Sequence, residues 1–197
     1  MSDNRLERVL GWIDAANAAD PSFEILEGVS QPKALQYGKR MSAWLEKGYP
    51  EASELLKIAA RGQHIRRWEV PRESYPATRD GYLKWRTYLY GFHADCVAAL
   101  MKDAGYQSSA VDRVKSLLQK RGIKTDPEVQ ALEDVICLVF LENYFDDFAP
   151  TQSGEKLLNI VRKTWGKMSE KGHGLALQLP FSQPVRELLA QALAQCE

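Results

Sequence analysis

A histidine and two arginines at the end of one apolar segment are the first residues whose types and spacing suggest chemistry. The segment LLKIAARGQHIRRWEVP, Leu55–Pro71, contains His64, Arg66 and Arg67. Its apolar residues recur with helical spacing, so we expect an amphipathic helix that ends before Pro71. Guanidinium groups suit the recognition of phosphate oxygens. The segment therefore predicts a site that holds a polar ligand such as a phosphate.

More arginines follow in the loop and in the helix expected after this segment. The set that we consider together is Arg66, Arg67, Arg72, Arg79 and Arg86. A phosphate clamp is one interpretation of this set. A series of surface ion pairs with Glu69, Glu73 and Asp80 is the other. The stretch 70–80 contains two prolines and is too long for a simple connection, which favours an ordered cover over a linker.

His93 and two acidic residues stand in helices that we expect to be buried. His93 shares a helical face with Leu89 and Cys96, so it should point inward. Glu133 and Asp134 directly precede the seven apolar residues VICLVFL. A buried carboxylate costs several kcal/mol unless it meets a cation, a metal or strong hydrogen-bond donors. Two interpretations of Asp134 stay open. Its carboxylate belongs to a functional site, or it has a structural role in which it pairs with an arginine or caps a neighbouring helix.

The elements that must position these residues are all helical. We find no strand pattern, and we predict one all-α domain over residues 1–197 with about seven or eight helices. The expected helices span roughly 6–19, 32–48, 52–69, 81–104, 109–118, 127–145, 156–168 and 182–193. Capping boxes are expected at Ser109 with Asp112 and at Thr125 with Glu128. Two glycines, at 172 and 174, are expected to interrupt the helical pattern.

Composition excludes several classes of function. Lys plus Arg equals Asp plus Glu, 26 each, so no global charge draws the chain to nucleic acid or to a membrane. The three cysteines, Cys96, Cys137 and Cys196, lack CxxC spacing, which favours reduced thiols in a cytoplasmic protein without a signal peptide. The longest apolar run, Val135–Leu141, is too short to span a membrane. Glycine-rich phosphate loops, GxSxG, HExxH and zinc-finger spacings are absent.

Six stretches of the chain carry a resemblance to a known family. They are IDAANAADP, AARGQHIRRWEVPR, GYLKWR, FHAD, LEDVICLVFLENYF and RKTWGKMS. Together they resemble the bacterial and fungal family catalogued as domain of unknown function 4202. The resemblance covers nearly the whole chain, and it implies no particular activity.

A more distant resemblance is to the HD superfamily of metal-dependent phosphohydrolases. LLKIAARGQHIRR is similar to the helix that ends in that superfamily's His-Asp pair, and TDPEVQALEDVICLVFLE to the helix with its last metal-binding aspartate. This resemblance implies an HD-like helical core. It also implies His64, His93 and Asp134 as ligands of a divalent transition metal such as Mn, Fe, Ni or Zn. Ile65 occupies the place of the paired aspartate and Tyr37 that of the first histidine.

Two functional hypotheses follow. In the first, the protein is a metal-dependent phosphohydrolase for a nucleotide or another phosphorylated small molecule. Its metal would activate water, with Glu133 for proton transfer and the arginines on the phosphate. The catalytic set would be Glu133, Arg66 and Arg67, and the ligand-binding set Arg72, Arg79, Arg86 and Tyr37.

In the second hypothesis, the same site has lost its metal and binds a phosphate-bearing ligand, or less readily RNA, without turnover. Ile65 favours this second hypothesis, whereas the retained histidines and the buried acid favour the first. Aromatic residues among the arginines meet the requirement for RNA only loosely, because most of them fit a core. The oligomeric state stays open.

Overall fold

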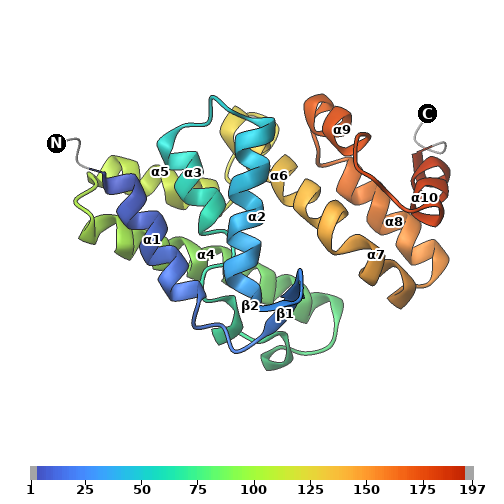
Figure 1. The fold of residues 1–197 in the computed structure, drawn as a ribbon, viewed down its shortest axis with the longest axis horizontal. Coiled ribbons are helices and arrows are strands. Elements are labelled where there is room, and N and C mark those ends of the chain that lie inside the picture. Colours follow the sequence, from blue (N-terminus) through green and yellow to red (C-terminus); the bar gives the residue numbers. More distant parts are fainter. Residues whose placement is uncertain (1–3, 194–197) are drawn as a thin grey trace. The chain divides into compact units, whose positions relative to one another are not determined.

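The computed structural model of the chain describes residues 4–193, and these residues are mostly helical. The all-α prediction is confirmed at this level, with one small two-stranded sheet in addition. The chain divides into two compact units, residues 1–122 and residues 123–197 (Figure 1).

The first unit is a helical assembly built around a shared apolar core. Its elements are α1 (Arg5–Asn17), β1 (Phe23–Leu26), β2 (Val29–Pro32), α2 (Lys33–Gly48), α3 (Glu54–Arg61), α4 (Arg79–Asp103) and α5 (Ser108–Leu118). Helix α1 packs on α2, α3 and α4, and α5 packs on α3 and α4. The largest fully buried side chains of this core are Ile13, Met41, Leu45, Leu56, Ile58, Ile65, Met101, Leu117 and Leu118. Burial of such side chains stabilises the unit by about 1.5–3 kcal/mol each.

Side-chain caps explain where several helices begin. Ser53 accepts a hydrogen bond from the backbone N–H of Leu56 at the start of α3, and Thr78 caps α4 in the same way. The expected capping box at Ser109 is wrong, because α5 begins one residue earlier after Gln107 and has no side-chain cap. At the second predicted capping box, the side chain of Asp126, and not that of Thr125, caps the helix that begins at Pro127.

The predicted long central helix is wrong. Helix α3 ends at Arg61, residues 62–66 form turns, and a short 3-10 helix, η1, covers Arg67–Glu69. Arg66 has a left-handed backbone (φ 52°), and its N–H donates to Oδ1 of Asn17 at 3.1 Å instead of continuing a helical ladder. Ile65 is nevertheless buried. The turn therefore buries an apolar side chain at the position where a longer helix would also bury one. For this reason the helical spacing of apolar residues predicted a helix that continues past Arg61.

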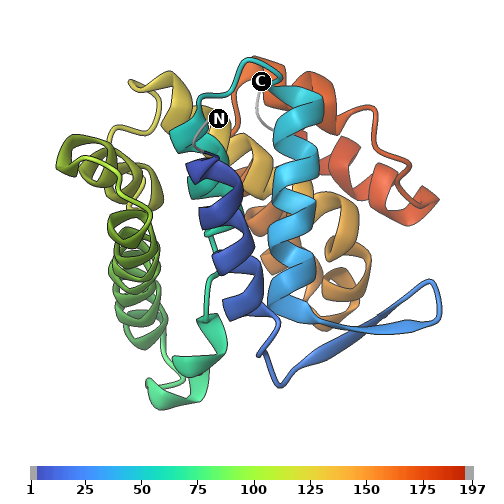
Figure 2. The ribbon, with the colours of Figure 1, turned by 60° about the vertical axis from the view of Figure 1, so that its left-hand side comes forward.

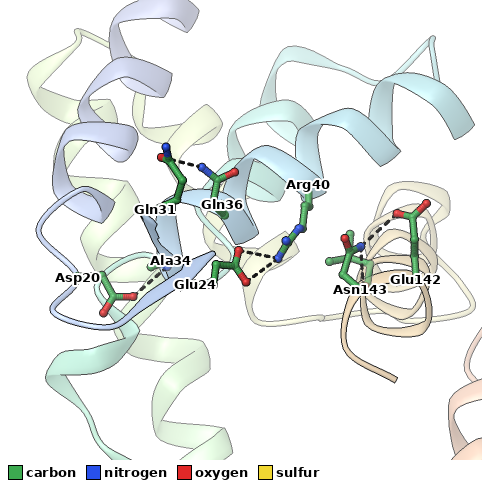
Figure 3. Close-up of polar contacts among 9 residues, drawn as sticks. Asp20, Glu24, Gln31, Ala34, Gln36, Arg40, Glu142 and Asn143 are labelled. Atoms are coloured by element: carbon green, nitrogen blue, oxygen red, sulfur yellow. Dashed lines mark hydrogen bonds and ion pairs between the residues drawn. The ribbon is translucent and has the colours of Figure 1, made fainter. Parts of the chain in front are cut away.

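A β-hairpin replaces the loop that was expected before α2. Strands β1 and β2 pair antiparallel, and Glu27 and Gly28 between them both have positive φ, as in the tight turns that hairpins use. Glu24 pairs with Arg40, at 2.8 Å, and ties the hairpin to α2 (Figure 3). Figure 2 shows the hairpin extending from the beginning of that helix. Four apolar residues of the strands are exposed: Phe23, Ile25, Leu26 and Val29.

The described part of the second unit contains helices joined by turns and no strand. They are α6 (Pro127–Asn143), α7 (Phe145–Phe148), the 3-10 helix η3 (Ala149–Thr151), α8 (Gly154–Trp165), α9 (Glu170–Ala176) and α10 (Gln183–Leu193). Helix α6 packs on α7 and α9, and α8 packs on α10. The predicted helix to residue 145 stops at Asn143, whose side chain donates to the carbonyl of Val139 at 3.1 Å (Figure 3). The predicted interruption at Gly172 and Gly174 is wrong, because both lie within α9.

Two of the three cysteines fall in the described part of the chain. Cys96 is half-buried and Cys137 is buried, and Cys196 lies outside the described residues. No helix among residues 4–193 has the length and apolar character needed to cross a membrane.

Candidate functional site

Three predicted site residues with ring side chains come together in the first unit. His64 lies in the turn after α3, Tyr37 lies on α2, and His93 lies in the middle of α4. The rings of Tyr37 and His64 stack with centroids 3.8 Å apart, and the rings of His64 and His93 lie 5.8 Å apart. His93 is only 2% exposed, so its predicted inward orientation is confirmed.

Arg67 places a positive charge beside this pair of histidines. Its Nη1 lies 2.9 Å from Nε2 of His64. Because a guanidinium group only donates, Nε2 of His64 must accept, and the neutral imidazole then carries its hydrogen on Nδ1. The other side of the guanidinium group faces the ring of Trp85, whose centroid is 4.7 Å from Cζ. Trp85 is itself fixed by a 2.9 Å hydrogen bond from Nε1 to the carbonyl of Val70.

Arg67 has no carboxylate within ion-pair distance among residues 4–193. It is half-buried, and burial lowers the pKa of its guanidinium group. Charged groups that leave water are normally paired with an opposite charge. A half-buried arginine that is hydrogen-bonded only to a neutral imidazole therefore marks a place that an anion would stabilise.

The surrounding charges have the same sign. Burial and then the positive charge of Arg67 lower the pKa of His64 well below its usual value, and His93 and Lys120 lower it further. Burial and Arg67 also lower the pKa of His93, to about 3. Arg86 lies close enough to lower the pKa of Arg67. At neutral pH both imidazoles are thus uncharged, and the side chain that lowers both of their pKa values is Arg67.

Arg86 and Lys120 reach this site beside Tyr90. Nε of Arg86 donates to the hydroxyl of Tyr90 at 2.7 Å, and Nζ of Lys120 lies 5.6 Å from the centre of the same ring. Arg86, Tyr90 and His93 follow each other at spacings of four and three residues, which places them on one face of α4. We name the whole group the His64 cluster: Tyr37, His64, Arg67, Arg86, Tyr90, His93 and Lys120. The sequence reasoning missed Tyr90, although its i+4 spacing from Arg86 was a usable signal.

His93 contributes a buried polar atom that the protein leaves unused. Its Nε2 has no hydrogen-bond partner among the described residues. The ring is flanked by His64 and by Phe92, with centroids 5.8 and 5.9 Å away. A buried polar atom without a partner costs about 1–3 kcal/mol, so such atoms are rare unless they serve a ligand or water.

The other predicted arginines have different surroundings. Arg66 forms an exposed ion pair with Glu69, at 2.6 Å, which is the surface interpretation considered for this set. Arg72 donates to the carbonyls of Tyr75 and Pro76, both at 2.8 Å, and so braces the loop that contains the 3-10 helix η2 (Arg72–Ser74). Arg79 is exposed at the first position of α4. Only Arg67 and Arg86 of the set belong to the His64 cluster.

The two predicted acidic residues lie on α6, in the second unit. Asp134 is fully buried, and its Oδ1 accepts from the N–H of Ser169 at 2.8 Å and from Nε2 of Gln130 at 3.0 Å. Oδ2 accepts from the hydroxyl of Ser169, the residue that caps α9. Glu133 is also buried, 3.6 Å from Nζ of Lys167. These contacts are the strong donors that a buried carboxylate needs, and they agree with a structural role for Asp134.

The fit of a metal ion can be considered from the chemistry of these donors. Among residues 4–193 no group of three or more His, Cys, Asp or Glu side chains is gathered as a metal site requires. In the first unit, Nε2 of His64 already accepts from Arg67, and cations surround the histidine pair. This donor set suits an anion better than a divalent cation, which prefers carboxylates beside its imidazoles.

Comparison with known proteins gives the chain its family. Residues 7–189 match the family described as Domain of unknown function (DUF4202), and the chain belongs to that family. The resemblance seen in the six sequence stretches is thereby confirmed. Neither a comparison with curated proteins nor one with solved structures found a match. The resemblance to the HD superfamily stays a prediction.

Proposed function

We propose that the protein binds a phosphate-bearing small molecule at the His64 cluster. One observation carries this proposal: Arg67 is half-buried, donates to a neutral imidazole, and has no carboxylate partner in the described part of the chain. A bound phosphate would supply the missing negative charge and would accept from the remaining N–H groups of the guanidinium fork. The positive charges of Lys120 and Arg86 act on His64 and on Arg67, respectively.

Phosphate chemistry is favoured over a carboxylate ligand by the number of available donors. Arg67 makes one hydrogen bond from its guanidinium group to the described residues, and Nε2 of the buried His93 has no partner among them. A phosphate monoester carries close to two negative charges at pH 7 and offers three acceptor oxygens. An arginine held in place by Trp85 is also suited to bidentate recognition of such an oxyanion.

Isothermal titration of the protein with inorganic phosphate and a panel of phosphorylated metabolites tests this proposal. Arg67→Gln should weaken binding by about tenfold or more, because a charge-assisted contact is worth about 1.5–3 kcal/mol. Arg66→Gln is the matched control, since the neighbouring arginine is exposed and paired with Glu69. If both variants bind as the wild type does, or if no compound of the panel binds, the proposed site is wrong.

Metal-dependent phosphohydrolysis on an HD-like core is the second candidate function. It rests on the resemblance to the HD superfamily, and the neutral histidine pair favours it because the uncharged imidazole is the metal-binding form. It would require Arg67 to release Nε2 of His64. Elemental analysis of wild type and His64→Ala tests this candidate. A stoichiometric Mn, Fe, Ni or Zn ion that the variant loses would support it, and a metal-free wild type after incubation with these ions would refute it.

A further inference from the structure

We infer that His93 is the innermost contact of the bound anion and restricts the site to terminal phosphates, as in a phosphate monoester, rather than to the diesters of a nucleic-acid backbone. This inference rests on the proposed phosphate site. Beyond that site, His93 is assigned as a ligand contact and phosphate monoesters as the class of ligand.

The first step is that Nε2 of His93 is available and deep. The side chain is 2% exposed, and no described residue hydrogen-bonds to this atom. Apolar substitution at this position would avoid the cost of a buried unpaired group, so a histidine here is explained by a partner from outside the chain. The same buried face of α4 carries Leu89 and Val97, which shows that the position is compatible with an apolar side chain.

The second step is that a further donor, Arg67, binds the neighbour of His93: Nη1 of Arg67 lies 2.9 Å from Nε2 of His64, whose ring centroid is 5.8 Å from that of His93. Arg67 lies near enough to His93 to lower the pKa of that imidazole, and only one hydrogen bond from its guanidinium group is made within the described chain. The remaining N–H groups of Arg67 are therefore available to oxygens of the same anion. In the neutral form with its hydrogen on Nε2, His93 would donate to one phosphate oxygen while Arg67 donates to others.

The third step concerns the shape of the anion. The ring of His93 has aromatic neighbours on two sides, His64 and Phe92. A monoester has three terminal oxygens and one substituent, so its free end can reach a buried donor while its substituent points outward. A diester carries substituents on two sides, and reaching the same atom would require one of them to enter among these rings. The arrangement thus favours the end of a small molecule over the middle of a polymer.

Titration of the wild-type protein with methyl phosphate and with dimethyl phosphate, at equal ionic strength, tests this inference without any substitution. We expect methyl phosphate to bind at least about tenfold more tightly. Equal affinity for the two esters would overturn the inference. Tighter binding of a single-stranded oligoribonucleotide than of methyl phosphate would also overturn it, because the polymer contains only internal diesters.

Two variants test the residue itself. His93→Leu should weaken methyl phosphate binding by about tenfold and leave the melting temperature at or above that of the wild type. Phe92→Leu is the control, because it removes the adjacent ring and no polar atom, and it should change the affinity by about twofold or less. Unchanged affinity in a folded His93→Leu protein would overturn the inference. If Arg67→Gln still weakens binding by about tenfold or more in that case, the proposed function stands and only the role of His93 falls. If methyl phosphate does not bind to the wild type, both fall.

Discussion

Gly172 on α9 offers a sharp test of the second unit, because its neighbour cannot move aside easily. A Cβ atom at this position would lie 2.7 Å from Cγ and 2.8 Å from Oδ1 of Asp134. Real Cβ atoms do not approach other heavy atoms so closely, so something would have to shift. The carboxylate is held by hydrogen bonds from Ser169 and Gln130, and displacing it would strain those contacts. We therefore expect Gly172→Ala to destabilise the protein by about 1–3 kcal/mol, the usual range for overpacking.

Gly174 provides the matched control within the same helix. A Cβ atom there would meet nothing within 4 Å, and the residue is exposed. Gly174→Ala should therefore stabilise the protein by about 0.5–1 kcal/mol, because alanine loses less backbone entropy in a helix. The two substitutions are chemically identical, so the expected difference between them, about 1.5–4 kcal/mol, isolates the contact with Asp134. Urea denaturation followed by circular dichroism measures both.

A double-mutant cycle identifies the clash partner. Asp134→Ala removes the carboxyl group, so the cost of Gly172→Ala should largely vanish in that background although the background itself is less stable. If the cost of Gly172→Ala were the same with and without the carboxylate, the explanation by this contact would be refuted. Equal stability of Gly172→Ala and Gly174→Ala would refute the packing of α9 against Asp134 altogether.

Three further predictions concern other parts of the structure. Burial and Arg67 hold the pKa of His93 at about 3 in the folded chain, against 6.5 in the unfolded chain. Because the unfolded chain binds more protons between these two pH values, the free energy of unfolding should fall as the pH drops below about 6.5. The urea midpoint of His93→Leu should depend less on pH over that range. Asp134→Ala should lower the free energy of unfolding by about 3–5 kcal/mol, because the donors of Ser169 and Gln130 lose their buried acceptor. A melting temperature close to that of the wild type would contradict this prediction. Arg61→Lys should cost about 1 kcal/mol in urea denaturation, since lysine cannot make the two 2.6 Å contacts of Arg61 with the Asp14 carboxylate, and an unchanged midpoint would argue against that bidentate pair.

The sequence predicted best where long periodic segments coincide with deep burial. Helix α4 and the inward orientation of His93 were predicted because seven turns of apolar spacing leave no other arrangement. Asp134 was predicted to be buried for a similar reason, since the apolar run beside it requires a helix covered on nearly all sides. The donors that hold Asp134 were beyond prediction, because Ser169 stands 35 residues away and nothing local marks the contact.

The hairpin and the helix starts failed for a different reason. The strands Phe23–Leu26 and Val29–Pro32 are four residues each, too short for an alternating pattern to stand out. Asp126 and Thr125 are both good capping residues, so composition alone does not decide which of two neighbours makes the cap. Such local choices are decided by tertiary packing, which fixes where each helix can begin.

The least predictable feature of the candidate site is the separation of two adjacent arginines. Arg66 and Arg67 were treated as one pair because they are adjacent in a segment that was expected to have helical geometry. The left-handed backbone of Arg66 breaks that geometry, so Arg66 turns to the surface and pairs with Glu69 while Arg67 turns inward to His64. A non-glycine residue in this conformation is uncommon, and it persists here because Asn17 accepts the hydrogen bond of its N–H. The position of the candidate anion site therefore depends on a contact from α1, a helix that contributes no residue to the His64 cluster.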